Sequence, residues 1–327
     1  MPRKRTYPPQ AVGEFFLDSG AHSLYNEKIG HSRLENDSLD GVSGTEKMKL
    51  RKISPALFRK TKEGNYDFYN TEEFWAYVDE YCQYVKENKY FIDYYVSVDV
   101  LFNPERSWDV WRYIQEKHGL DPVPVVHYGT NVKWVEKYLD AGCKYLGIGG
   151  IGQEQSKQSY ISWADQVFSI ICNSKTKKPL VKTHGFAMTG YELLVRYPWY
   201  SVDSASWAKA AAFGRIYVPK RRNGIYCFST QPYTMSVSHK SPSRKKRGRN
   251  VLNLSNGEQR VIREWVESVG VPFGELDDNG EEKVRGIITH HAERKIANMR
   301  YYEALLNWLP NYPRIFKHIP RKGFLKL

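Results

Sequence analysis

The sequence predicts an α/β fold, a (β/α)8 TIM barrel followed by a basic, mostly helical C-terminal extension. Eight short β-prone runs recur between residues 14 and 228, and stretches with helical periodicity separate most of them. Alternation of strands and helices at this spacing is typical of a parallel sheet, and eight such units are enough to close a barrel. The hydrophobic content of 41% is sufficient for a sizeable core.

The expected strands are all short. They cover residues 14–17, 91–98, 123–126, 145–148, 179–183, 200–202, 215–218 and 225–228. The connection between the last two strands, residues 219–224, is too short to hold a helix. The final unit therefore departs from an ideal barrel, or one strand is misplaced.

Helix signals fill most of the connections. Asn103 and Pro104 open one helix, and Gly119 closes it. Further helices are expected at about residues 131–140 and 159–173, after a cap at Thr189, from about Ser206, and at 255–268 and 287–309 in the extension. Thr71 is expected to cap another helix, whose apolar face consists of Phe74, Val78, Tyr81, Cys82 and Val85.

Composition divides the chain into three parts. A basic arm covers residues 1–13, the barrel covers 14–237, and a basic linker with a helical extension covers 238–327. A long basic insertion, residues 24–70, follows the first strand. Connections of this length are usually functional or disordered, so a loop that covers the substrate and a solvated surface loop are both open interpretations.

The formal net charge of +13 favours a polyanionic partner such as nucleic acid, with a basic enzyme that lacks such a partner as the alternative. The four cysteines lie far apart, so we expect reduced thiols of a cytosolic protein and no zinc site. The chain shows no signal-peptide pattern and no apolar run as long as a membrane span. We expect a soluble, cytoplasmic protein without a membrane partner.

Polar or glycine residues follow six of the expected strands. Because all strands of a barrel run in one direction, the residues at their C-terminal ends meet at one mouth. Each residue taken singly is more simply a turn, a helix cap or a satisfied hydrogen-bonding group. Together they predict an active site that contains Asp18, Asp99, His127, Gly149, Gly150, His184 and Asp203.

The residue types at this mouth favour carboxylate chemistry without a metal. A hydrolytic metal barrel usually carries a His-x-His pair on its first strand, whereas this chain has Asp18-Ser19-Gly20 there. Residues 147–152 also lack the spacing of a dinucleotide-binding motif, so no cofactor is expected. One carboxylate as nucleophile and another as general acid/base suit displacement at a sugar anomeric carbon. A third can accept two N–H groups from a guanine edge.

These motifs resemble the tRNA-guanine transglycosylase superfamily, most closely its DNA-acting, DpdA-like branch, whose members insert 7-deazaguanines into phage and bacterial DNA. The similarity runs from about Phe15 to Trp207. The segments that carry it are Leu17-Asp18-Ser19-Gly20-Ala21, Val98-Asp99, Ile148-Gly149-Gly150, Lys182-Thr183-His184-Gly185-Phe186 and Tyr197 to Trp207.

The resemblance implies a base exchange in double-stranded DNA. Asp203 would be the nucleophile and Asp18 the general acid/base. The residues that would contact guanine or the incoming 7-deazaguanine, expected to be preQ0, are Asp99, His127, His184 and the backbone of Gly149 and Gly150. The resemblance implies neither a metal nor another cofactor.

Two departures from the family pattern leave alternatives open. The zinc motif of the tRNA enzymes, Cys-x-Cys-x-x-Cys with a His, is absent, and His127 stands where those enzymes use a Gln. A tRNA-acting transglycosylase, a barrel hydrolase acting on nucleosides and a non-catalytic nucleic-acid-binding protein are the alternatives. The sequence does not indicate an oligomeric state.

The basic segment after the barrel yields a prediction about DNA binding. We expect it to hold duplex DNA through Lys240, Arg244, Lys245, Lys246, Arg247 and Arg249, with a solvated linker as the alternative. Each neutralised phosphate contributes about −0.9 to the log–log salt slope of binding. Replacing residues 244–247 by Ser should flatten that slope by about 2–4 units, measured by fluorescence anisotropy on duplex DNA. An unchanged slope would identify the segment as a linker.

Overall fold

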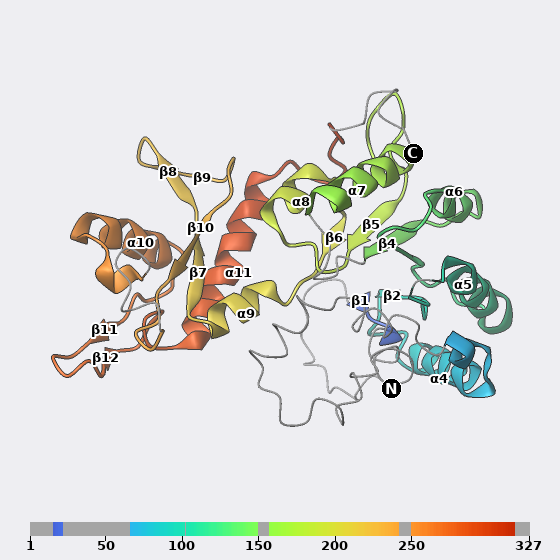
Figure 1. The fold of residues 1–327 in the computed structure, drawn as a ribbon, viewed down its shortest axis with the longest axis horizontal. Helices are drawn as coiled ribbons and strands as arrows, with labels where there is room; N and C mark the ends of the chain where they lie inside the picture. Colours follow the sequence, from blue (N-terminus) through green and yellow to red (C-terminus); the bar gives the residue numbers. More distant parts are fainter. Residues whose placement is uncertain (1–15, 22–65, 102, 150–156, 242–249, 318–327) are drawn as a thin grey trace, which may run out of the picture. The chain divides into compact units, whose positions relative to one another are not determined.

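A computed structural model describes residues 16–21, 66–101, 103–149, 157–241 and 250–317 of the chain (Figure 1). The chain divides into two compact units between Ser156 and Lys157, and each unit is described by itself. Helices and parallel strand pairs occur in both units, so the α/β class is confirmed. None of the described helices is long and apolar enough to cross a membrane.

The first unit contains parallel strand pairs with helices packed on one side of them (Figure 1). Strand β1 pairs with β2, and β3 pairs with β4; an isolated bridge from Val96 to Val123 links the second strand region to the third. The elements are β1 (Phe16–Leu17), α4 (Glu72–Glu87), β2 (Tyr94–Tyr95), α5 (Pro104–His118), β3 (Val125–His127), α6 (Lys133–Asp140) and β4 (Tyr145–Gly149).

The helix signals of the first unit are confirmed. The side chain of Thr71 accepts a hydrogen bond from the backbone N–H of Phe74, so it caps α4 as predicted, and the predicted apolar face of that helix is buried. In α5 the side chain of Asn103 caps the helix, Pro104 occupies its first turn, and Gly119 ends it in the left-handed conformation.

The second unit begins with two further parallel strands and their helices. Strand β5 pairs with β6 in register His184 to Ser201 and Gly185 to Val202. The elements are α7 (Lys157–Ile171), β5 (Lys182–Gly185), α8 (Tyr191–Arg196), β6 (Ser201–Val202) and α9 (Ser206–Ala212). The fifth strand thus lies two to three residues later than expected, and Gly190, not Thr189, is the cap residue of α8.

The last two expected barrel strands form but do not pair in parallel. Strand β7 (Arg215–Val218) pairs antiparallel with β10 (Tyr233–Ser236), and β8 (Lys220–Arg222) forms a hairpin with β9 (Ile225–Cys227). Parallel strands need a crossover of about a dozen residues, whereas Asn223 and Gly224, with φ of 49° and 80°, make a tight hairpin turn. The prediction of two final parallel strands is therefore wrong, and the described residues show no closed barrel.

The C-terminal helices pack into the same core as the preceding strands. Ile216 and Val218 of β7 belong to one buried cluster with Trp265, Tyr301 and Leu305. The elements after β10 are α10 (Asn256–Ser268), β11 (Glu275–Leu276), β12 (Glu282–Val284) and α11 (His291–Trp308), and both helices were predicted. The boundaries 14–237 and 238–327 stay predictions.

Buried polar side chains fix α11 to its neighbours. Asn298 donates to the carbonyl oxygen of Trp207 (3.0 Å) and accepts from the N–H of Tyr217 (2.9 Å). Arg294 donates from Nε to the carbonyl oxygen of Ala211 (2.9 Å) at the end of α9. These bonds satisfy backbone groups that would otherwise be buried without partners.

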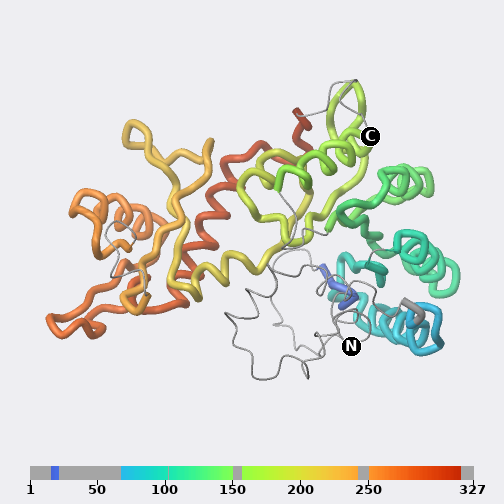
Figure 2. Tube along the Cα trace, viewed as in Figure 1, coloured from blue at the N-terminus to red at the C-terminus, as the bar shows by residue number. Residues whose placement is uncertain are grey.

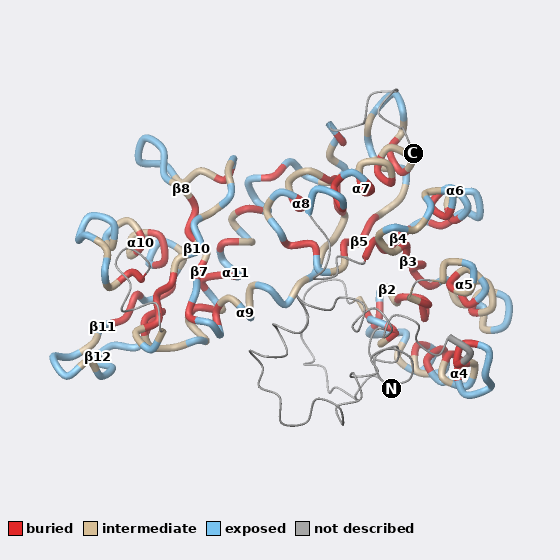
Figure 3. The backbone as a smooth tube through the Cα atoms, viewed as in Figure 1, coloured by how far each residue is buried: buried red, intermediate tan, exposed pale blue. Residues whose placement is uncertain are grey.

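The packing of α11 predicts a difference between two adjacent leucines. Leu305 is fully buried, whereas Leu306 is 55% exposed. Figure 3 shows both buried and exposed stretches along α11. Leu305→Ala should lower the free energy of unfolding by about 2–5 kcal/mol, because it removes apolar contacts and leaves a cavity. Leu306→Ala is the matched control and should change it by less than about 0.5 kcal/mol. Urea denaturation of both variants tests this, and equal losses would contradict the packing described.

Candidate active site

Asp203 lies directly after β6, where backbone hydrogen bonds fix it from both sides. Its N–H donates to the carbonyl oxygen of Gly185 (3.2 Å), and its carbonyl oxygen accepts from the N–H of Met188 (3.0 Å). These two bonds extend the β5–β6 pairing by one residue, and they place Asp203 against the turn that follows β5. Its side chain is 62% exposed, so the carboxylate is open to solvent and to a reactant.

Two groups from the β5 end contact one oxygen of this carboxylate. Oδ1 accepts a hydrogen bond from the N–H of Ala187 (2.8 Å) and lies 3.6 Å from Nε2 of His184. No other described residue hydrogen-bonds to Oδ2. Among the described residues, the contacts that hold this carboxylate therefore fall on Oδ1.

The pKa of Asp203 lies below its usual value. Partial burial by itself would raise this pKa, but His184 and the Ala187 N–H stabilise the charged form, and their combined effect is larger. Asp203 is consequently a carboxylate at neutral pH. An ionised, oriented and exposed carboxylate can act as a nucleophile or as a charge stabiliser.

His184 is buried and is itself held by a neighbour. Its Nδ1 lies 2.6 Å from the hydroxyl of Ser201, the residue opposite it in the strand register, and its ring meets the edge of Phe186. In the tautomer whose Nδ1 accepts the Ser201 hydroxyl hydrogen, the ring proton sits on Nε2 and faces Asp203. The hydrogen bond to Ser201 thus orients the ring toward the carboxylate.

The turn that carries the Ala187 N–H has an unusual backbone. Ala187 has φ of 60°, in the left-handed region that residues with a Cβ seldom adopt. Such conformations cost about 1–3 kcal/mol and occur often at functional sites. Here the strained residue is the one whose N–H donates to Asp203.

A second pair of predicted residues meets in the first unit. His127 ends β3, and its Nε2 lies 2.5 Å from Oδ2 of the buried Asp99. The carboxylate therefore has one oxygen engaged with the imidazole. The residue that follows His127 remains in the sheet, since the N–H of Tyr128 donates to the carbonyl oxygen of Gly149 (2.9 Å).

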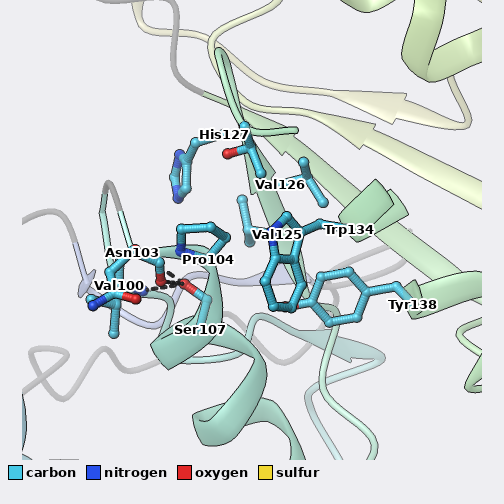
Figure 4. Close-up of a pocket in the computed structure, with 10 residues that line it drawn as sticks. Val100, Asn103, Pro104, Ser107, Val125, Val126, His127, Trp134 and Tyr138 are labelled. Atoms are coloured by element: carbon cyan, nitrogen blue, oxygen red, sulfur yellow. Dashed lines mark hydrogen bonds between the residues drawn. The ribbon is translucent and has the colours of Figure 1, made fainter. Parts of the chain in front are cut away.

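A small hollow lies beside His127 (Figure 4). Its apolar wall includes Val125, Trp134 and Tyr138, and its polar lining includes Asn103 and His127. In Figure 4 the His127 ring and Asn103 lie on the side of the hollow away from Tyr138. The hollow has room for little more than a single water molecule.

The Asp18-Ser19-Gly20 turn after β1 is built around Ser19 and Gly20. Ser19 is fully buried, and its carbonyl oxygen accepts from the hydroxyl of Tyr77 (2.7 Å). Gly20 has φ of 73°, and a Cβ there would lie 2.9 Å from the Tyr77 oxygen. Asp18 is exposed. Burial raises the pKa of the Tyr81 hydroxyl well above its usual value, and the negative charge of Asp18 is the second largest cause of this rise.

The remaining predicted residues are only partly described. Gly149 is buried at the end of β4, whereas Gly150 lies outside the described residues. Lys240 follows a turn in which its N–H donates to the Ser238 hydroxyl (3.3 Å). The predicted DNA contacts Arg244, Lys245, Lys246, Arg247 and Arg249 lie outside the described residues.

Within the described ranges no cluster of three or more His, Cys, Asp or Glu could hold a metal ion. Comparison of the chain with protein-family models, curated proteins and solved structures found no match. The resemblance of the strand-end motifs to transglycosylases therefore stays a prediction.

Sequence reasoning missed Ser201 and Ala187. Ser201 and Asp203 are two positions apart at the end of one extended segment, so their side chains lie on the same face. This spacing could have identified Ser201 as a neighbour of the predicted site. Ala187 contributes through its N–H and its backbone conformation, and neither can be predicted from the residue type.

The contacts of Asp203 predict how its pKa responds to mutation. His184→Ala removes a group that favours the carboxylate, so the pKa of Asp203 should rise toward the usual aspartate value. Because the native pKa is lowered, its contribution to stability is present above the unfolded-state pKa and is lost as pH falls through the native pKa. Carbon-13 NMR titration of the Asp203 carboxyl measures the shift.

His239→Ala is the matched control for this titration. His239 contacts the carbonyl oxygen of Ile288 (2.9 Å), whereas the described contacts of the Asp203 carboxylate are with His184 and Ala187, so removal of His239 should leave the Asp203 titration in place. If both variants titrate like the unmodified protein, His184 does not set the pKa of Asp203.

Proposed function

We propose that the protein is a DNA-guanine transglycosylase, which exchanges guanine in DNA for a 7-deazaguanine base such as preQ0. The observation that carries this proposal is Asp203, an exposed carboxylate held through Oδ1 by His184 and the Ala187 N–H. Its lowered pKa keeps it ionised at neutral pH. The strand-end motifs that resemble transglycosylases supply the substrate class.

In the proposed reaction, Asp203 replaces one base by another through a covalent sugar–enzyme intermediate. A deoxyguanosine is extruded from the duplex, at a cost of a few kcal/mol. An oxygen of Asp203 bonds to C1′, the C1′–N9 bond breaks with its electron pair on N9, and Asp18 supplies the proton that guanine takes. The incoming base then loses its N9 proton to Asp18 and attacks C1′, which releases Asp203.

The environment of Asp203 supports the nucleophilic role. A nucleophile must be unprotonated and must present an oxygen that the protein does not already occupy. Within the described residues Asp203 meets both conditions, because the pKa is lowered and because both contacts from the β5 end are made with Oδ1. A covalent intermediate on a carboxylate is also the route used by retaining glycosidases.

Base recognition is assigned to the Asp99–His127 pair, following the resemblance. Asp99 Oδ2 contacts His127, so in this proposal Asp99 Oδ1 and the imidazole together read the polar edge of the base. An imidazole can donate or accept according to its protonation, whereas the glutamine of the tRNA enzymes does both at once. The pair would therefore recognise guanine-type bases with a different set of hydrogen bonds.

Base exchange in the Asp203→Asn variant tests the proposal. An amide is a poor nucleophile, so exchange of labelled guanine or preQ0 into duplex DNA should fall by at least about a thousandfold. The protein–DNA adduct that survives denaturation should disappear as well. Asp278→Asn is the matched control. Asp278 is exposed in a turn, so the same substitution there should leave the rate of base exchange unchanged.

Other results identify the alternative functions. An adduct formed at the normal yield by Asp203→Asn would show that Asp203 is not the nucleophile. Release of free guanine at the same rate without an incoming base would indicate a hydrolase. Faster exchange into tRNA than into duplex DNA would reassign the substrate, and the absence of any exchange would leave a binding protein.

A further inference from the structure

Positive charge in the second unit is concentrated immediately after Asp203. Residues 204–257 contain eleven Lys and Arg residues and no Asp or Glu. The whole chain has a formal net charge of +13, so this stretch accounts for most of the excess. Only part of it is the basic segment predicted from the sequence to bind DNA; Lys220, Arg221 and Arg222 lie earlier, on a described element.

That element is the β8–β9 hairpin, which extends away from β7 and β10 (Figures 1 and 2). Three residue pairs face each other across it: Lys220 with Cys227, Arg221 with Tyr226, and Arg222 with Ile225. Asn223 and Gly224 form its tip. It forms a two-stranded sheet of its own, and Figure 3 shows its tip as exposed.

The two faces of the hairpin differ in their partners. Residues opposite each other in an antiparallel pair lie on the same face, so Arg221 and Tyr226 share one face. Arg221 forms an ion pair with Glu264 of α10 (2.5 Å), and the Tyr226 ring packs on the edge of Trp265 (centroids 5.0 Å apart). This inner face is thus attached to α10, and its cation is already neutralised.

The outer face consists of Lys220, Arg222, Ile225 and Cys227. Neither Lys220 nor Arg222 forms an ion pair with any residue that the structure describes. Ile225 is 73% exposed at the tip, and Tyr233, which lies under the Lys220 ammonium (5.5 Å to the ring centroid), is 54% exposed. The face therefore offers two cations without an ion-pair partner among the described residues, beside exposed apolar and aromatic groups.

We propose that the outer face of the β8–β9 hairpin binds duplex DNA, with the hairpin in the major groove and Lys220 and Arg222 on the flanking phosphates. The choice of duplex DNA over other polyanions rests on the proposed function. The hairpin is a two-stranded β-ribbon, an element that the major groove of B-DNA, about 12 Å wide, admits. The major groove of A-form RNA is too deep and narrow for such an element.

The chemistry of the outer face fits this partner. Unpaired Lys and Arg side chains release counterions when they neutralise phosphates. The exposed Ile225 at the tip can contact thymine methyl groups, which line the major groove. The inner-face ion pair to Glu264 holds the ribbon in place, so the outer face is presented by a supported hairpin.

Salt-dependent binding tests the proposal, in the Asp203→Asn background so that no chemistry contributes. Lys220→Ser/Arg222→Ser should flatten the log–log salt slope on duplex DNA by about 2 units, about 0.9 per phosphate. Arg285→Ser/Arg300→Ser is the matched control, which removes the same charge from two cations outside the hairpin that are already paired with Glu293 and Glu303. Its slope should change by less than about half a unit.

Cys227 offers a second readout in the unmodified chain. It lies on the outer face and is partly exposed, whereas Cys82, Cys143 and Cys172 are buried. Duplex DNA at saturating concentration should slow alkylation of Cys227 by iodoacetamide at least fivefold at low salt, and high salt should abolish the protection. An RNA duplex of the same sequence should protect much less.

The outcomes separate this inference from the proposed function. Equal slope changes in both double variants, no protection of Cys227, or stronger protection by duplex RNA would each overturn the hairpin assignment, even if base exchange occurs. A slope change confined to Lys220→Ser/Arg222→Ser, with protection by duplex DNA, supports it even if the protein exchanges no base. Circular dichroism and thermal unfolding of both double variants verify that the hairpin mutations leave the fold intact.

Discussion

The parallel pairing of β5 with β6 is the constraint on which the candidate active site depends. It sets Gly185 opposite Val202, and the next backbone bond joins the Asp203 N–H to the Gly185 carbonyl oxygen. The side-chain period of a strand is two, so a slip of one residue would turn Asp203 to the opposite face of the sheet. The contacts with His184 and the Ala187 N–H exist only in the observed register.

Close packing behind the two strands holds that register. A Cβ on Gly185 would lie 2.8 Å from the Met188 side chain and 3.1 Å from the Trp199 ring, so only glycine allows this approach. Trp199 packs edge-on against Phe168, which stacks on Tyr197 at 4.6 Å. Phe168, Tyr197 and Trp199 are thus buried behind the strands, while the Asp203 carboxylate is exposed, a combination that places a charge without neutralising it.

The second unit also distributes its cations between two roles. Arg221 pairs with Glu264, and Arg294 donates to the backbone carbonyl oxygens of Ala211 and Ile287, so these two cations serve the fold. Lys220 and Arg222 alternate with Arg221 along one strand and point to the other face. Alternation in a single hairpin therefore separates structural cations from those that a polyanion could neutralise.

The sequence by itself determined the helices and the positions of the polar strand ends. The caps at Thr71 and Asn103 each act within three residues of their partner, so a local pattern is enough to predict them. Tertiary structure decided which strand ends meet. The pairs His184 with Ser201 and Asp99 with His127 join residues 17 and 28 positions apart, and the antiparallel turn at Asn223 and Gly224 replaced an expected parallel unit. Residue type shows that a side chain can form a hydrogen bond, but only strand order and register choose its partner, because they depend on the packing of the whole core.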